Sequence, residues 1–163
     1  MSDNQEDKIN LEEDTQHGRF LTFALGKEVY GMEIKYVTEI IGMQAITVVP
    51  EVPIYVKGII NLRGKIIPVI DVRIKFKKEP IPYGDRTCIV VIDIDDVSVG
   101  LIVDQVTEVL TIPDEDIAPP PSNKTGIENR YIKGIGKIQN TVTLLLDCEK
   151  LLSDDEMKAV TSV

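Results

Sequence analysis

The sequence contains an internal duplication, and this feature constrains the fold more than any other. Residues 21–41 align with residues 90–110 at a constant offset of 69, and both copies carry Val-Thr-Glu, at 37–39 and 106–108. After a change in length the match resumes at an offset of 76, where residues 55–59 (YVKGI) align with residues 131–135 (YIKGI). Both halves therefore follow one structural plan.

The shared plan is typical of β-structure. Residues 20–23 and 89–92 are short β-branched or aromatic runs that lead to Gly26-Lys27 and Asp95-Asp96, which suit two-residue hairpin turns. We expect the strands that follow to end near Val37 and Val106. Four to five short strands per half are expected to close into a small barrel, because open strand edges favour aggregation. The sequence thus predicts an all-β, mainly β, chain of two packed barrels with short helices, one of them at the C-terminus.

A second hairpin is predicted in each half, with turns at Arg63-Gly64 and Gln139-Asn140. Gly64 and Asn140 occupy the same turn position and are the residue types that most easily accept a left-handed backbone. The glycines near Lys57-Gly58 and Lys133-Gly134 lack the spacing of a phosphate loop and indicate bulges or tight bends.

Asp71 and Asp147 stand where a strand should give way to a short helix, and a carboxylate there can cap free N–H groups. The alternative is an aspartyl hydrolase with one aspartate from each half. Such sites need a small residue and a glycine after each aspartate, but Val72-Arg73 and Cys148-Glu149 follow here, so capping is favoured. Residues 153–156 (SDDE) match a capping box that opens a C-terminal helix.

Composition excludes several classes of function. The net charge is -9, and the first seventeen residues carry -5 of it, with no basic stripe to match a nucleic-acid backbone. No stretch approaches the length of a membrane span, so we expect a cytoplasmic chain with no direct membrane insertion. Cys88 and Cys148 are expected to be reduced. The acidic groups at residues 93–96 and 114–116 lack the glycine and distal glutamate of a calcium loop, so we expect solvated turns and no cofactor or metal.

Arg63 is the strongest candidate for partner binding. Its counterpart in the second half is Gln139, so the barrel does not require arginine at this position, and arginine is enriched at protein interfaces. Glu39 is matched by Glu108 and could serve the fold or a partner; both readings stay open.

Residues 59–73 (IINLRGKIIPVIDVR) are very similar to the signature of the CheW family of chemotaxis coupling proteins. Residues 30–40 and 100–110 resemble two further segments of that family. The resemblance covers about residues 18–158. It implies two five-stranded SH3-like barrels in a scaffold without catalytic activity, cytoplasmic and recruited to membrane-associated receptor arrays.

The resemblance also implies the partners: the cytoplasmic tip of a chemoreceptor, which docks between the barrels, and the CheW-like regulatory domain of the histidine autokinase CheA. Carried over by motif position, the candidates for partner binding or its support are Val37, Glu39, Gly58, Asn61, Arg63, Thr87 and Val106.

We expect residues 1–17 to form a flexible acidic tail, residues 18–158 one CheW-like domain, and residues 151–163 the C-terminal helix and chain end. The barrels should span about residues 18–80 and 86–150, with exchange of strands across the boundary left open. We expect a monomer when the chain is free. Two rival interpretations share the fold: an excised regulatory domain of the kinase, which the acidic N-terminus argues against, and an adaptor of a pathway other than chemotaxis.

Overall fold

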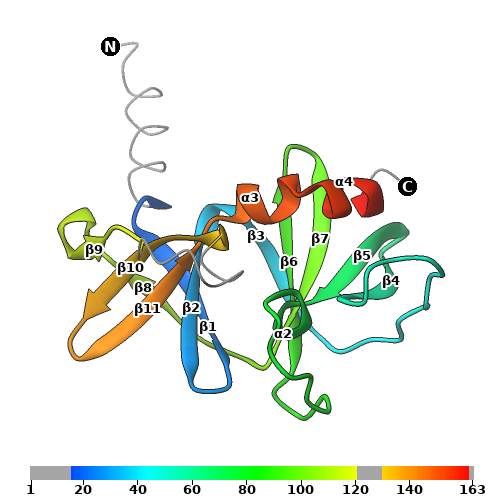
Figure 1. The fold of residues 1–163 in the computed structure, drawn as a ribbon, viewed down its shortest axis with the longest axis horizontal. Helices are drawn as coiled ribbons and strands as arrows, with labels where there is room; N and C mark the ends of the chain where they lie inside the picture. Colours follow the sequence, from blue (N-terminus) through cyan, green and yellow to red (C-terminus); the bar gives the residue numbers. More distant parts are fainter. Residues whose placement is uncertain (1–15, 121–129, 162–163) are drawn as a thin grey trace, which may run out of the picture.

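The computed structural model describes residues 16–120 and 130–161. Within them the chain is mainly β, with two sheets and short helices, as the sequence predicts (Figure 1). Most of the predicted acidic tail lies outside the described residues, as does the end of the proline-rich stretch at residues 117–122 (IAPPPS).

Sheet A has six strands in the order β8-β1-β2-β11-β10-β9. The strand bounds are β1 Arg19–Leu25, β2 Glu28–Glu33, β8 Gln105–Thr111, β9 Ile117–Ala118, β10 Ile132–Ile138 and β11 Thr141–Leu146. All neighbouring pairs are antiparallel except β2 and β11, which run parallel.

Sheet B has five strands in the order β3-β6-β7-β5-β4. The strand bounds are β3 Val37–Gly42, β4 Val56–Leu62, β5 Lys65–Asp71, β6 Cys88–Ile94 and β7 Val97–Val103. Its parallel pair is β5 and β7. Each sheet thus contains one parallel pair of strands, and its other neighbouring pairs are antiparallel. This shared arrangement is the structural form of the sequence duplication.

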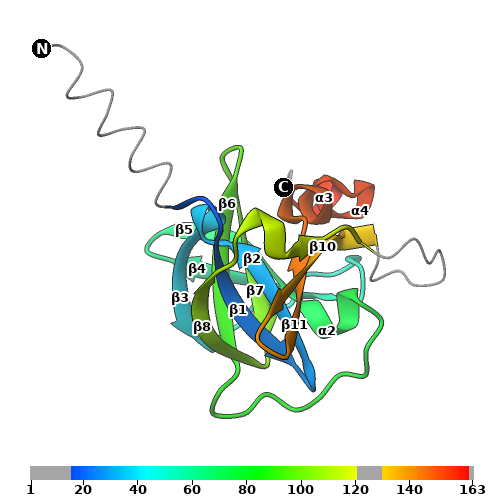
Figure 2. The same cartoon turned by 90° about the vertical axis from the view of Figure 1, so that its left-hand side faces the viewer.

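Neither sheet belongs to one half of the sequence. β1 and β2 from the first half complete sheet A, while β6 and β7 from the second half complete sheet B. The two halves exchange their first hairpins, so neither half closes its own sheet. Figure 2 shows sheet A from its outer side, with β1 between β2 and β8.

Within residues 16–120 and 130–161, short helices join or cover the sheets: α2 Val72–Lys75, α3 Cys148–Ser153 and α4 Asp155–Thr161. In Figure 1, α3 and α4 run from the side of sheet A towards sheet B, so the end of the second half covers part of the first. Among the described residues, no helix is long and apolar enough to cross a membrane.

The largest hydrophobic cluster lies between the sheets and takes residues from both. A row of aromatic rings runs through it, from Phe23 to Tyr30, Phe76 and Tyr131, with ring centroids 5.6, 5.6 and 5.8 Å apart. Two smaller clusters pack against single sheets: one around Ile67 of sheet B, and one in which Ile112, just after β8, packs with Phe20 and Leu145 of sheet A. The shared cluster makes the two barrels one packing unit.

The hairpin turns fall at the predicted dipeptides. Gly26 and both Asp95 and Asp96 have positive φ, at 61°, 52° and 65°. The expectation for Asn140 is wrong, because Gln139 (φ 47°) is the left-handed residue of that turn. Val37 also begins a strand instead of ending one, since residues 34–36 form a 3₁₀ turn that redirects the chain from sheet A into sheet B.

The two repeated aspartates cap helices, as predicted. Asp71 accepts a hydrogen bond from the N–H of Ile74 (3.3 Å), and Asp147 accepts one from Lys150 (3.0 Å). The predicted capping box is displaced by one residue: Asp154, not Ser153, accepts from the N–H of Glu156 at the start of α4. The Ser153 hydroxyl instead donates to the Lys150 carbonyl within α3.

Candidate functional site

Arg63 lies at the tip of the β4–β5 hairpin and forms an ion pair with Glu39 of β3. β3 and β4 are the two edge strands of sheet B, so this contact shows that the sheet curls until its edges approach. The Arg63 side chain is 70% exposed and that of Glu39 is 27% exposed. The guanidinium is thus held by one carboxylate while most of its surface faces solvent.

Asn61 shapes the turn that carries Arg63. Its Oδ1 accepts a hydrogen bond from the N–H of Gly64 at 2.8 Å. Arg63 and Gly64 both have positive φ, at 52° and 88°, the geometry of a tight two-residue hairpin turn. Asn61 therefore positions the arginine through the backbone.

Gly58 lies at a β-bulge between β4 and β5 and has a φ of 147°. A Cβ atom at this position would lie 2.1 Å from the carbonyl oxygen of Thr47. Thr47 and Ile59 exchange two backbone hydrogen bonds of 2.9 Å here. Glycine allows the segment after β3 to pair with β4, so its role is structural. Gly134 marks the corresponding bulge in the second half, which confirms the predicted bends.

Val37 and Val106 occupy corresponding places in the two sheets. Val37 pairs with Ile92 of β6, and Val106 pairs with Phe23 of β1. Both side chains are half-buried and pack against the cluster between the sheets. Each therefore gives part of its apolar surface to the core and leaves the rest exposed to solvent.

Thr87 lies just before β6, where its hydroxyl accepts a hydrogen bond from the N–H of Gly84 at 2.9 Å. The adjacent side chain of Arg86 reaches Gln105, the neighbour of Val106, at 3.4 Å. Five of the seven candidates thus form two groups, with Glu39, Asn61 and Arg63 brought together at one place and Thr87 near Val106 at another.

The match to known proteins covers both groups. The family model of the CheW-like domain matches residues 19–156. The chain belongs to the CheW-like domain family. It is 39% identical over 144 residues to the chemotaxis protein CheW of Klebsiella aerogenes, covering 88% of this chain and 87% of that protein. It is 34% identical over 149 residues to the chemotaxis protein CheW of Treponema pallidum, covering 89% and 88%.

A solved structure extends the CheW-like likeness to three dimensions. The crystal structure of the scaffolding protein TtCheW from Thermoanaerobacter tengcongensis matches with a TM-score of 0.74 and 36% identity, over 79% of this chain and 88% of that one. The resemblance inferred from residues 59–73 is confirmed.

In this CheW-like fold the repeated aspartates have structural partners. The second oxygen of Asp71 accepts a hydrogen bond from the Tyr83 hydroxyl at 2.8 Å, and burial together with this bond raises the pKa of Tyr83. Asp71 ends a strand of sheet B, while Asp147 follows a strand of sheet A. Each carboxylate is used at its own helix, which counts against a shared hydrolytic site.

Most of the acidic residues considered as metal ligands lie in turns, as expected, but Asp93 is a residue of strand β6. Asp95 and Asp96 form the β6–β7 turn, and residues 114–116 form a 3₁₀ turn. In the part of the chain that the structure describes, no three His, Cys, Asp or Glu side chains gather closely enough to hold a metal ion. Cys148 is buried and Cys88 half-buried, both as free thiols, and burial raises the pKa of each.

The sequence reasoning missed an ion pair where the chain crosses from sheet B to sheet A. Arg73 of α2 donates two hydrogen bonds of 2.7 Å to Asp104, which also accepts from the Gly26 N–H at 2.7 Å. Burial alone would raise the pKa of Asp104, but the bonds from Arg73 and Gly26 outweigh it and lower that pKa. The bidentate geometry ties α2 to the first hairpin and to the crossover.

A second missed cluster surrounds Lys75, whose side chain is only 5% exposed. Its Nζ lies 4.1 Å from the ring centre of Tyr55 and 5.2 Å from that of Tyr131, the matched tyrosines of the two halves. It pairs with Asp154 at 3.0 Å, and Asp154 also accepts from the Tyr131 hydroxyl at 2.6 Å. Lys75 thus joins both halves to the start of α4.

Both missed residues carry the signal that singled out Arg63. At the offset of 76, Arg73 corresponds to Glu149 and Lys75 to Leu151. All three cations are present in the first copy and absent from the second. Extending the comparison of the two copies to every charged residue would have found them.

Proposed function

We propose that this chain is a non-enzymatic adaptor that couples the cytoplasmic tip of a chemoreceptor to the regulatory domain of the histidine kinase CheA. Membership of the CheW-like family supports the adaptor role, as do relatives named as chemotaxis proteins and a related structure described as a scaffolding protein. In this proposal the chain is cytoplasmic, monomeric when free, and recruited to receptor arrays.

The observation that carries the proposal is the exposed Arg63 held by Glu39 at the closed edge of sheet B. A guanidinium with free N–H donors can bind carboxylate or carbonyl groups of a partner helix with defined geometry. The second half has Gln139 in place of Arg63, so the fold forms this hairpin without a charge. The arginine is therefore available for recognition.

The remaining candidates take supporting roles in this proposal. Val37 and Val106 supply apolar surface for a docked helix. Asn61 and Gly58 hold the hairpin and the segment beside it in the geometry that presents Arg63. Thr87 is the weakest candidate, because its hydroxyl is engaged with Gly84. The adaptor unit is taken as residues 18–158, with an acidic tail before it and the end of the C-terminal helix after it.

Reconstitution tests this function. The receptor signalling domain and the kinase are mixed with and without this protein, and kinase autophosphorylation is measured together with the size of the complex. We expect a ternary complex and a change in kinase activity that depends on the receptor. An unchanged activity without any ternary complex would contradict the adaptor function.

A further inference from the structure

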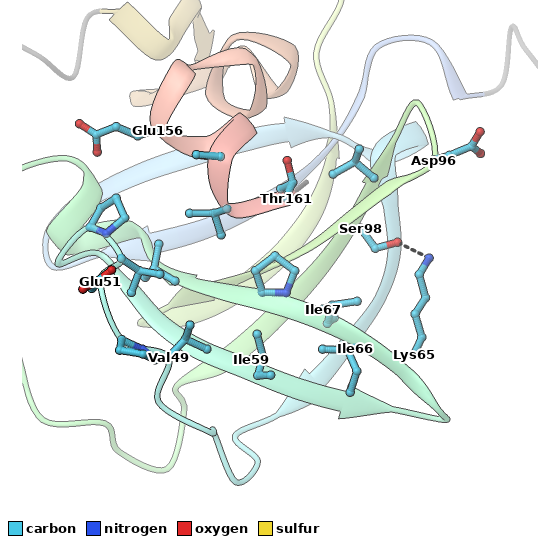
Figure 3. A pocket seen from close by; sticks show the side chains of 18 residues that line it. Val49, Glu51, Ile59, Lys65, Ile66, Ile67, Asp96, Ser98, Glu156 and Thr161 are labelled. Carbon is cyan, nitrogen blue, oxygen red and sulfur yellow. Dashed lines mark hydrogen bonds between the residues drawn. The ribbon is translucent and has the colours of Figure 1, made fainter. Parts of the chain in front are cut away.

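The outer face of the β4–β5 hairpin carries a groove of about 760 Å³ that the proposed receptor contacts do not use (Figure 3). Its floor includes Ile59 of β4 and Ile66 and Pro68 of β5. Residues 49–53 form one wall, and residues 159–161 of α4 form another. Binding sites for small ligands and side chains fall in the range of about 300–1,000 Å³, so this groove is large enough to receive part of a partner.

One wall of the groove is fixed by specific contacts. Tyr55, just before β4, donates a hydrogen bond to Glu156 of α4 at 3.0 Å. The ion pair of 3.0 Å between Lys75 and Asp154 anchors the start of the same helix. The helix that ends the second half is thereby held over the first half. A preformed wall lowers the cost of ordering a bound segment.

The groove is apolar inside and acidic at its rim. Ile66 on the floor is 56% exposed, a large apolar surface that the described part of the chain leaves uncovered. Glu51, Asp96 and Glu156 stand around the edge (Figure 3). Lys65 is the cation among the described lining residues, and it donates a hydrogen bond to Ser98 at 2.8 Å. Three carboxylates against one ammonium leave the rim negative.

We propose that this groove docks a short partner segment with apolar side chains at its centre and Lys or Arg residues towards its ends. The apolar centre would cover Ile59 and Ile66, and the basic ends would meet the carboxylates of Glu51, Asp96 and Glu156. A second copy of this chain is a poor occupant, because the chain carries a net charge of -9 and would bring like charge to an acidic rim. The proposal goes beyond the adaptor function and uses none of Glu39, Asn61 or Arg63.

Two synthetic peptides test the proposal with the full-length protein. The first has about twelve residues with a leucine-rich centre and two lysines at each end, a length that spans a typical helix-in-groove contact. The second has glutamate in place of each lysine. Titration at low salt should show saturable binding of the lysine peptide that is at least about tenfold tighter than that of the glutamate peptide, and salt should reduce the difference.

Matched variants locate the binding. Ile66→Asn should weaken binding of the lysine peptide about tenfold or more. Val142→Asn is the control, because Val142 is the repeat counterpart of Ile66 with a similar exposure, 54% against 56%, and lies outside the groove. Combining Glu51→Gln with Asp96→Asn should largely remove the preference for lysine, and asparagine tolerates the positive φ of residue 96.

Three outcomes would overturn the proposal. Equal affinity for the two peptides would remove the basic specificity. Equal effects of Ile66→Asn and Val142→Asn would place binding elsewhere. The third outcome combines two results: the unmodified protein binds neither peptide, and Ile66→Asn no longer binds the kinase regulatory domain. The groove would then be part of an interface between folded domains. The peptide titration contains neither receptor nor kinase, so its failure leaves the adaptor function untouched.

Discussion

Arg63 and Glu39 form an ion pair between the tip of one edge hairpin and the opposite edge strand of sheet B. The counterpart of Glu39 is Glu108, but the counterpart of Arg63 is Gln139. The carboxylate is therefore common to both halves, while the pair exists only in the first. Because only the first half has the arginine, the fold does not require Arg63, which is available for recognition. The glutamate is present in both halves and can serve the fold.

Arg63→Ala should destabilise the protein by less than about 1 kcal/mol, because the arginine is 70% exposed and surface ion pairs contribute little. Urea unfolding of this variant and of Gln139→Ala should give nearly equal free energies of unfolding. A loss of several kcal/mol in Arg63→Ala alone would mean that the ion pair closes the barrel and is not free for recognition.

Gly58→Ala should destabilise the protein severely, by about 3 kcal/mol or more, because its methyl group would clash with the Thr47 carbonyl oxygen at a strained backbone position. Gly64→Ala is the matched control, since φ is also positive there but no atom lies within 4 Å of the added Cβ. Gly64→Ala should lower the free energy of unfolding by about 1 kcal/mol. Thermal unfolding of both variants measures the difference, and similar losses would remove the close approach as its cause.

Removing Lys75 should loosen α4. Lys75→Met keeps the length of the side chain but removes the charge that pairs with Asp154 between the two tyrosine rings. Breaking a buried pair from one side costs about 3 kcal/mol. Compared with the unmodified protein, the variant should show faster hydrogen exchange at the amides of α4 and little change at those of the β6–β7 hairpin. Unchanged protection of α4 would show that the ion pair does not anchor the helix.

Protonation of Asp154 should lower the stability of the folded protein at acidic pH. A hydrogen bond from Tyr131, with further help from Lys75, lowers the pKa of Asp154 from an ordinary value of 3.8 to about 2. A carboxyl whose pKa is lower in the folded state contributes stability that is complete above the ordinary pKa and is lost as the pH falls towards the folded pKa. Asp154→Asn should therefore flatten the fall in stability between about pH 4 and pH 2. Unfolding by urea across this range measures it, and an unchanged slope would contradict the assignment.

Much of the fold could be predicted from the sequence because its signals are local. Short β-branched runs, turn dipeptides and helix caps depend on neighbouring residues, and the duplication let each be checked in the other copy. The exchange of hairpins between sheets could not be predicted, since residues 20–33 contain the same apolar runs and turn whichever strands they pair with. The displaced cap at Asp154 has a similar origin: its carboxylate also binds Lys75 and Tyr131, which are distant in sequence.

The candidate site was predicted in part. Arg63 and Asn61 belong to one hairpin, so their proximity follows from the turn. The pairing of Arg63 with Glu39 depends on how far sheet B curls, which no local pattern specifies. The structural role of Gly58 depends on a backbone contact with Thr47 that is visible only in three dimensions.

Binding of the receptor tip to two matched charge variants tests the central claim most directly. Arg63→Asp and Gln139→Asp place the same charge at corresponding hairpin tips, and circular dichroism should first show that both variants fold. The adaptor account predicts that Arg63→Asp weakens receptor-tip binding by about tenfold or more, while Gln139→Asp binds like the unmodified protein. Equal binding by the two variants would contradict it.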